Sequence, residues 1–224
     1  MREKYMGTSK LLLFDFDGTI ANSIGTFLDL GNEMAIKYNK PSFTMEQFQL
    51  FNQLSMKEKC RQLGIPLYKI PEFTIEILKK FRQHLSTVPP ITDMYDTISN
   101  LRENGYRIAI LSSNSEVNIR AWLDVQKFDI FDDVIASPGL FGKARSISNL
   151  IKKKKLHRDD IVYIGDEVRD IDACKKSHVP IIAVTWGLDS PSYLLQANPD
   201  YMAHEPSDIV RILNNHYPER SKRT

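Results

Sequence analysis

The chain has 224 residues, of which 42% are hydrophobic and 26% are charged. This length allows about one to one and a half domains with a sizeable core, and this composition excludes a disordered or fibrous protein. The net charge of +2 shows no excess of either sign. We therefore expect no nucleic-acid partner and no membrane-surface partner.

The two cysteines, Cys60 and Cys174, lie 114 positions apart. Their spacing fits no metal-ligand pair, and a disulfide framework needs more cysteines, so we expect free thiols in a reducing compartment. The apolar run Leu11–Phe14 ends at Asp15 and is too short for a signal peptide or a membrane helix. These patterns predict a cytoplasmic protein, which we expect to be a monomer or a homodimer.

In chain order, a short apolar run comes first, and a segment without strand patterns follows it. The run Leu11–Phe16 is typical of a buried strand, and an acidic residue lies near its end. The segment 22–90 has helical patterns punctuated by prolines, and Pro89-Pro90 marks its boundary. The helices expected there are Ser23–Tyr38, Met45–Leu54, Met56–Gly64 and Glu72–Leu85. The sequence thus predicts a helical insertion at 22–90, with 1–21 and 91–224 forming the rest of the fold.

After the insertion, apolar runs alternate with helical patterns. The expected strands are Ile108–Leu111, Val134–Ala136, Ile161–Ile164 and Pro180–Thr185, and the expected helices are Thr97–Asn104, Ala144–Lys155 and Arg169–Ser177. Fully apolar strands suit a parallel sheet that is covered on both faces, so the pattern predicts an open α/β fold. Ligands of such sheets bind beyond the carboxyl ends of the strands.

The first strand is followed by Asp15-Phe16-Asp17-Gly18-Thr19. Carboxylates at positions i and i+2 of an extended backbone point the same way, and two close carboxylates require either a cation or a shared proton. A simpler reading is an Asx turn in which Asp17 caps the next helix. The pentapeptide alone does not exclude that reading.

Later strand ends add further polar groups. Ser112-Ser113-Asn114 supplies hydroxyls and a helix N-terminus, which suit an anion or a simple helix cap. Lys143 follows a short loop, and Asp166 and Asp170 follow the strand Ile161–Ile164 one helical turn apart. Carboxylates with hydroxyls and one lysine form a suitable set for Mg²⁺ and a phosphate group.

With these four motifs in order, the sequence resembles the haloacid dehalogenase-like superfamily of phosphatases. The resemblance covers residues 1–20 and about 92–215, and the layout is similar to phosphoglycolate-phosphatase-like proteins, including Gly165-Asp166-Glu167 and Ala183–Gly187. It implies an α/β, Rossmann-like parallel sheet core with an inserted all-helical cap domain. One departure is Ala144, where many relatives have a proline after the lysine.

The resemblance also implies a role for each residue in hydrolysing a small-molecule phosphate ester. Asp15 is the nucleophile, and Asp17 is the general acid and base. Ser112, Ser113 and Lys143 bind phosphoryl oxygens. Mg²⁺, the expected cofactor, is bound by Asp15, the Asp17 backbone carbonyl and Asp166. Asp170 orients Lys143 or a metal-bound water.

Two alternatives stay open. A sugar-phosphate mutase of the same superfamily would transfer the phosphoryl group to a second hydroxyl, although Thr19 favours a hydrolase. A non-catalytic binding protein could retain the fold, although the complete motif set argues against it. Within the insertion, Lys57, Lys59, Arg61, Phe48 and Phe51 are candidates to face the pocket, and Arg61 is the test case for a second anionic group on the substrate.

Overall fold

The computed structural model describes residues 10–54, 56–137 and 142–217. Its core is one six-stranded sheet in which every paired strand runs parallel to its neighbours, in the order β3-β2-β1-β4-β5-β6. The strands are β1 (Leu11–Phe14), β2 (Arg107–Ser112), β3 (Asp133–Ala136), β4 (Ile161–Gly165), β5 (Ile181–Val184) and β6 (Tyr201–Ala203). The parallel α/β fold expected from the sequence is confirmed.

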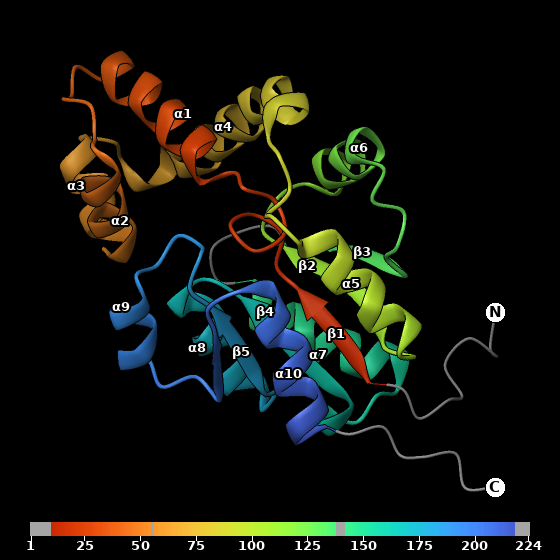
Figure 1. Ribbon diagram of the computed structural model, residues 1–224. Helices are drawn as coiled ribbons and strands as arrows, with labels where there is room; N and C mark the ends of the chain where they lie inside the picture. Colours follow the sequence, from red (N-terminus) through yellow and green to blue (C-terminus); the bar gives the residue numbers. More distant parts are fainter. Residues whose placement is uncertain (1–9, 55, 138–141, 218–224) are drawn as a thin grey trace, which may run out of the picture.

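Helices cover both faces of this sheet (Figure 1). The α-helices of this part are α5 (Met94–Glu103), α6 (Glu116–Gln126), α7 (Lys143–Lys154), α8 (Val168–Ser177), α9 (Pro191–Gln196) and α10 (Pro206–His216), with the short 3-10 helix η3 (Arg158–Asp160). The alternation of side chains along β1 explains the two layers. Leu12 and Phe14 pack with α5, α6 and α10, whereas Leu11 and Leu13 pack with α7, α8 and α9.

Residues 22–90 contain helices and no strand of the sheet within their described part. These helices are α1 (Ile24–Lys37), α2 (Met45–Gln53), α3 (Met56–Leu63), η1 (Leu67–Lys69), α4 (Ile70–His84) and η2 (Leu85–Thr87). They gather to one side, past the carboxyl end of β1 (Figure 1). The segment leaves and rejoins the sheet at one place, where Ala21 forms an isolated bridge with Pro90.

Local chemistry accounts for the boundaries of the insertion helices. Thr44 accepts a hydrogen bond from the Gln47 backbone N–H, and the Gln47 side chain accepts one from the Thr44 N–H, which makes a capping box for α2. Pro71 lies in the first turn of α4, where a missing N–H costs nothing, so this helix begins at Ile70, before the expected Glu72. Phe27 stacks on Phe81 with ring centroids 4.6 Å apart and joins α1 to α4.

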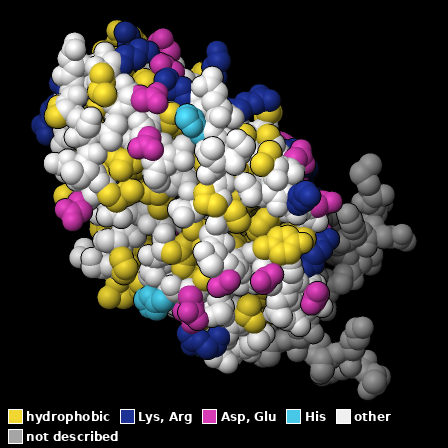
Figure 2. Space-filling model, turned by 45° about the horizontal axis from the view of Figure 1, so that its top comes forward, with side chains coloured by type: hydrophobic (Ala, Val, Ile, Leu, Met, Phe, Trp, Pro, Cys, Tyr) yellow, Lys and Arg dark blue, Asp and Glu magenta, His cyan; other side chains and the backbone are white. Residues whose placement is uncertain are grey.

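The surface carries both signs of charge in an interspersed pattern, as Figure 2 shows for one face. Within the described residues, no helix combines the length and the apolar character that a membrane crossing requires.

Candidate active site

The carboxyl ends of β2, β1 and β4 lie side by side at one edge of the sheet. From β1 the chain adds strands first on one side and then on the other, and ligands of open α/β sheets bind at such a point. Asp15 directly follows β1, Ser112 is the last residue of β2, and Asp166 directly follows β4. All three side chains are buried. The sheet therefore brings together three of the residues that the sequence motifs singled out.

Lys143, the first residue of α7, lies between two carboxylates. Its ammonium group is 2.5 Å from Asp15 Oδ2 and forms a second ion pair with Asp170. Burial acts to lower the pKa of Lys143, but the charges of Asp15 and Asp170 outweigh it and raise that pKa above its ordinary value. Lys143 is thus held as a fixed positive charge beside Asp15.

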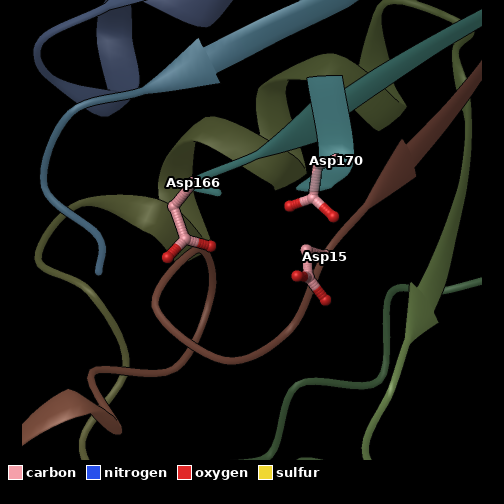
Figure 3. Close-up of side chains that lie close together, drawn as sticks. All are labelled: Asp15, Asp166 and Asp170. Carbon is pink, nitrogen blue, oxygen red and sulfur yellow. The ribbon is translucent and has the colours of Figure 1, made fainter. Parts of the chain in front are cut away.

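Three buried carboxylates, Asp15, Asp166 and Asp170, offer oxygen atoms that all lie within 4.8 Å of one another (Figure 3). Burial is the main cause that raises the pKa values of Asp166 and Asp170. Asp170 Oδ2 is buried without a hydrogen-bond partner, so it is an acceptor left unused by the described residues. Three clustered carboxylates beside the single lysine fit a hard divalent cation, which prefers oxygen ligands.

The carboxylate of Asp166 is fixed by its surroundings. The Thr19 hydroxyl donates to its Oδ1 at 2.7 Å, and the Leu188 backbone N–H donates to its Oδ2 at 2.8 Å. A Cβ added to Gly18 would lie 2.3 Å from Asp166 Oδ2, and one added to Gly187 would lie 2.0 Å from the Asp166 Cβ. Both glycines therefore leave the space that this carboxylate occupies.

Asp17 has a separate environment. The Ser23 hydroxyl donates to its Oδ1 at 2.9 Å, and the Asn114 side-chain amide donates to its Oδ2 at 2.9 Å. Burial raises the pKa of Asp17 to about 7, while the hydrogen bond from Asn114 acts in the opposite direction. A carboxyl group with that pKa can both give and take a proton near neutral pH.

The two serines after β2 differ in their surroundings. Ser112 is buried, and its hydroxyl accepts a hydrogen bond from the Asn114 backbone N–H at 3.2 Å. Ser113 is half-buried, and its hydroxyl is 3.4 Å from an Arg169 guanidinium nitrogen. Arg169 also pairs with Glu167 at 2.5 Å. Ser113 thus contacts Arg169 of α8.

Sequence reasoning missed Asp189, Asn114 as the partner of Asp17, and Thr19 as the donor to Asp166. Asp189 is buried and accepts a hydrogen bond from the Val168 N–H at 2.8 Å, which holds the first turn of α8 behind the site. Burial raises the pKa of Asp189 to about 6. It lies in no local motif, so no pattern in the sequence marks it.

The five insertion residues that the sequence singled out differ in their exposure and packing. Lys57 and Arg61 are exposed, whereas Lys59 is half-buried and lies 5.8 Å from the Phe51 ring centroid. The Lys59 ammonium group donates to the Asn52 side-chain oxygen at 3.5 Å. Burial lowers the pKa of Lys59, and the charges of Glu167 and Asp189 act to raise it. Phe48 and Phe51 pack within the insertion, against Gly31 and Phe43 respectively.

Known proteins resemble this chain in sequence and in fold. A family model described as "Haloacid dehalogenase-like hydrolase" matches residues 12–184. A phosphoglycolate phosphatase from Synechococcus elongatus is 28% identical over 90% of this chain and 96% of its own length. The pyrophosphatase PpaX from Listeria monocytogenes is 25% identical over 93% and 98% of the two chains. A solved haloacid dehalogenase-like family protein from Streptococcus pneumoniae shares the fold, with a TM-score of 0.77, 19% identity and coverage of 93% and 100%.

Proposed function

Since the chain belongs to the haloacid dehalogenase-like hydrolase family, we propose that this phosphatase hydrolyses a small phosphate monoester with the help of Mg²⁺, through an aspartyl-phosphate on Asp15. The observation that carries the proposal is the difference between the two carboxyl groups of the first motif. Asp15 is paired with Lys143 beside two further carboxylates, whereas Asp17 sits apart on neutral donors with a pKa of about 7.

The carboxylates present fit the metal. Asp15 and Asp166 would hold it together with the Asp17 backbone carbonyl, and the unused oxygen of Asp170 would accept from a water in its shell. When bound, Mg²⁺ supplies positive charge that reduces the repulsion between the phosphate group and the Asp15 carboxylate.

In the first step, an oxygen of Asp15 attacks phosphorus and the bond from phosphorus to the ester oxygen breaks. Asp17 gives its proton to the departing alkoxide, so the leaving group departs as a neutral alcohol. Lys143 and the hydroxyls of Ser112 and Ser113 hold the phosphoryl oxygens, on which negative charge is concentrated.

In the second step, Asp17 is ionised and takes a proton from a water molecule. The resulting hydroxide oxygen bonds to phosphorus, the bond from phosphorus to Asp15 breaks, and inorganic phosphate leaves. Each residue then returns to its starting state. The donors Ser23 and Asn114 keep Asp17 in place while its charge changes.

For substrate choice, we propose that residues 22–90 form a cap domain over the core of residues 1–21 and 91–224. Lys59 is half-buried, and the charges of Glu167 and Asp189 in the core act on its pKa, which supports a role for this cap in contacting the leaving group. A phosphate ester of a small acid, as in phosphoglycolate, suits such a contact, and the resemblance to a phosphoglycolate phosphatase supports it. The resemblance to PpaX makes pyrophosphate a second candidate substrate.

A phosphate-release screen tests the proposal. Wild-type protein is incubated with phosphoglycolate, other small alkyl phosphates, sugar phosphates and pyrophosphate, with Mg²⁺ and with a chelator. We expect release from at least one alkyl phosphate with Mg²⁺ only, and no release by the Asp15→Asn variant. An isomeric sugar phosphate in place of free phosphate would indicate a mutase. Mg²⁺ binding without turnover of any compound would favour a non-catalytic protein.

A further inference from the structure

One face of helix α6 donates hydrogen bonds to the helical insertion. Asn118, Trp122 and Gln126 follow one another at intervals of four residues and therefore lie on the same side of the helix. The Asn118 amide donates to the Leu78 carbonyl of α4 at 3.0 Å. Trp122 and Gln126 both donate to the Val88 carbonyl, at 2.9 and 3.1 Å. This face of α6 is thus the seat on which the end of the insertion rests.

Asn118 differs from the other two residues because it also connects to the site. The same amide nitrogen that donates to Leu78 donates to the Asn114 side-chain oxygen at 3.2 Å. The Asn114 amide nitrogen in turn donates to Asp17 at 2.9 Å. Two asparagines, buried with 3% and 2% of their surface exposed, therefore connect α4 to the carboxyl group of Asp17.

The directions of these hydrogen bonds are set by the network itself. The Asn114 oxygen accepts from both the Ser115 backbone N–H, at 2.8 Å, and the Asn118 amide. Its NH₂ group must therefore face Asp17, because a flipped amide would place its nitrogen against two donors. Asn118 thus helps to fix the orientation of the Asn114 side-chain amide, with its NH₂ group toward Asp17.

The other oxygen of Asp17 is also connected to the insertion. It accepts from Ser23, the residue that precedes helix α1. Both donors to Asp17 are therefore connected to residues 22–90. Ser23 lies within this segment, and Asn114 is connected through Asn118 to Leu78 of α4.

We propose that Asn118 is a positioning residue that couples the seating of helix α4 on α6 to the orientation of Asp17. The inference rests on the proposed role of Asp17 as acid and base. When α4 leaves its seat, Asn118 loses the Leu78 carbonyl and the Asn114 amide loses a fixed partner. Asp17 is then aimed at the leaving group only when the insertion is seated over the substrate.

Leaving groups of different basicity test this coupling. An alkyl phosphate needs a proton from Asp17 as its bond to phosphorus breaks, whereas 4-nitrophenyl phosphate has a stable leaving anion and needs little help. The ratio of kcat/KM for the two compounds measures how well Asp17 acts as an acid, because kcat/KM excludes the later hydrolysis step. The alkyl compound is phosphoglycolate, or the alkyl phosphate that the wild-type protein hydrolyses fastest.

We expect Asn118→Ala to lower this alkyl-to-aryl ratio by about 10-fold, part of the 10²- to 10⁴-fold that a well-placed acid supplies. Gln126→Ala is the matched control, because it removes another bond from α6 to the insertion without a connection to Asp17. It should leave the ratio unchanged. In an Asn114→Ala background, Asn118→Ala should have no further effect on the ratio, because the connection is already broken.

An equal loss with both compounds, or a ratio in Asn118→Ala that matches Gln126→Ala, would overturn the coupling. Asp17→Asn separates this failure from failure of the proposed function. If Asp17→Asn leaves the ratio at its wild-type value, Asp17 is not the acid and both ideas fail. If Asp17→Asn lowers the ratio and Asn118→Ala does not, only the coupling fails. Should Asn118→Ala not fold, Asn118→Asp keeps the shape of the side chain and removes both N–H donors.

Discussion

At the scale of single residues, two glycines leave the space that the Asp166 side chain occupies. Gly18 has a φ of +76°, which other residues rarely adopt, and Gly187 packs directly on the Asp166 side chain. The same carboxylate accepts hydrogen bonds from Thr19 and Leu188. A substitution that displaces these neighbours therefore also displaces Asp166, a proposed metal ligand.

Gly187→Ala should therefore weaken metal binding. The added methyl group would lie 2.0 Å from the Asp166 Cβ, so the carboxylate must shift. We expect Mg²⁺ affinity to fall by about 10-fold or more, as measured by calorimetry. Gly25→Ala is the control, because no atom lies within 4 Å of its added methyl group. Unchanged Mg²⁺ affinity in Gly187→Ala would argue against Asp166 as a ligand.

The raised pKa of Asp17 predicts a dependence of stability on pH in the metal-free protein. Burial raises this pKa from 3.8 to about 7 in the folded state, so between about pH 4 and pH 7 the folded state binds more protons than the unfolded state. The free energy of unfolding should therefore fall as the pH rises through this window. Asp166 and Asp170, whose pKa values are also raised, act in the same direction.

Denaturant unfolding in a chelator at pH 5 and pH 8 measures this effect. We expect Asp17→Asn to lose less stability between the two pH values than the wild type, because one of the titrating carboxyl groups is gone. Asp124→Asn changes an exposed carboxylate on α6 and should follow the wild type. An Asp17→Asn curve parallel to the wild-type curve would contradict the raised pKa.

The residues of the site that could be predicted are those whose position follows from a strand end. Asp15, Ser112 and Asp166 come together because parallel strands end at one edge. Asn114, Asn118 and Asp189 could not be predicted as partners, because their contacts depend on how a helix or loop packs over the sheet. A hydrogen bond such as that from Asn118 to Leu78 spans 40 positions and has no signature in either segment.

At the scale of secondary-structure elements, the short helix α3 shows why a residue chosen by type can face the wrong way. Lys59 and Arg61 are two positions apart, and two positions on a helix differ by about 200° in direction. Lys59 is half-buried, and Arg61 is exposed. We therefore expect Lys59, and not Arg61, to supply a positive charge to the substrate.

Lys59→Ala should lower kcat/KM for phosphoglycolate by about 10-fold, equivalent to about 1.4 kcal/mol, because a charged contact with the substrate carboxylate is lost. The same variant should retain its kcat/KM for 4-nitrophenyl phosphate, which has no carboxylate. Arg61→Ala removes an equal charge from the same helix and should change neither value. Equal losses with both compounds in Lys59→Ala would assign the lysine a structural role.

Element predictions succeeded where the pattern was strong and local. The strands β1, β2, β4 and β5 each contain an apolar run that is buried on both faces, and the sequence shows each of these runs. Strand β6 was not predicted, because its three residues, Tyr201–Ala203, lie at the sheet edge and two of them are only partly buried. Strand β1 ends at Phe14, two residues before the expected end, because the chain enters a turn in which the Phe16 carbonyl accepts hydrogen bonds from Thr19, Ile20 and Ala21.

At the scale of the whole molecule, the clustered carboxylates link metal binding to stability. Bringing Asp15, Asp166 and Asp170 within 4.8 Å costs electrostatic free energy that a bound cation offsets. Mg²⁺ at about 100 times its dissociation constant should add about 2.7 kcal/mol to the free energy of unfolding. For a chain of this size, that is a rise of about 5–10 °C in Tm.

Thermal unfolding with MgCl₂ and with KCl of equal ionic strength measures this rise. The rise should appear only with Mg²⁺, and it should be largely absent from Asp166→Ala, in which a proposed ligand is missing. A rise of the same size in Asp166→Ala would place the binding site elsewhere.

The order of the strands has a consequence for the synthesis of the chain. Strand β1 is the first to leave the ribosome and lies at the centre of the sheet, yet its partners are β2, which begins at Arg107, and β4, which begins at Ile161. Its four apolar residues are therefore unpaired until about 90 and then about 150 further residues have been made, a delay of about 5–30 s at about 5–20 residues per second. The insertion helices emerge within that interval and need no strand partner. The helices of residues 22–90 should thus form before the strands that carry the active-site residues are paired.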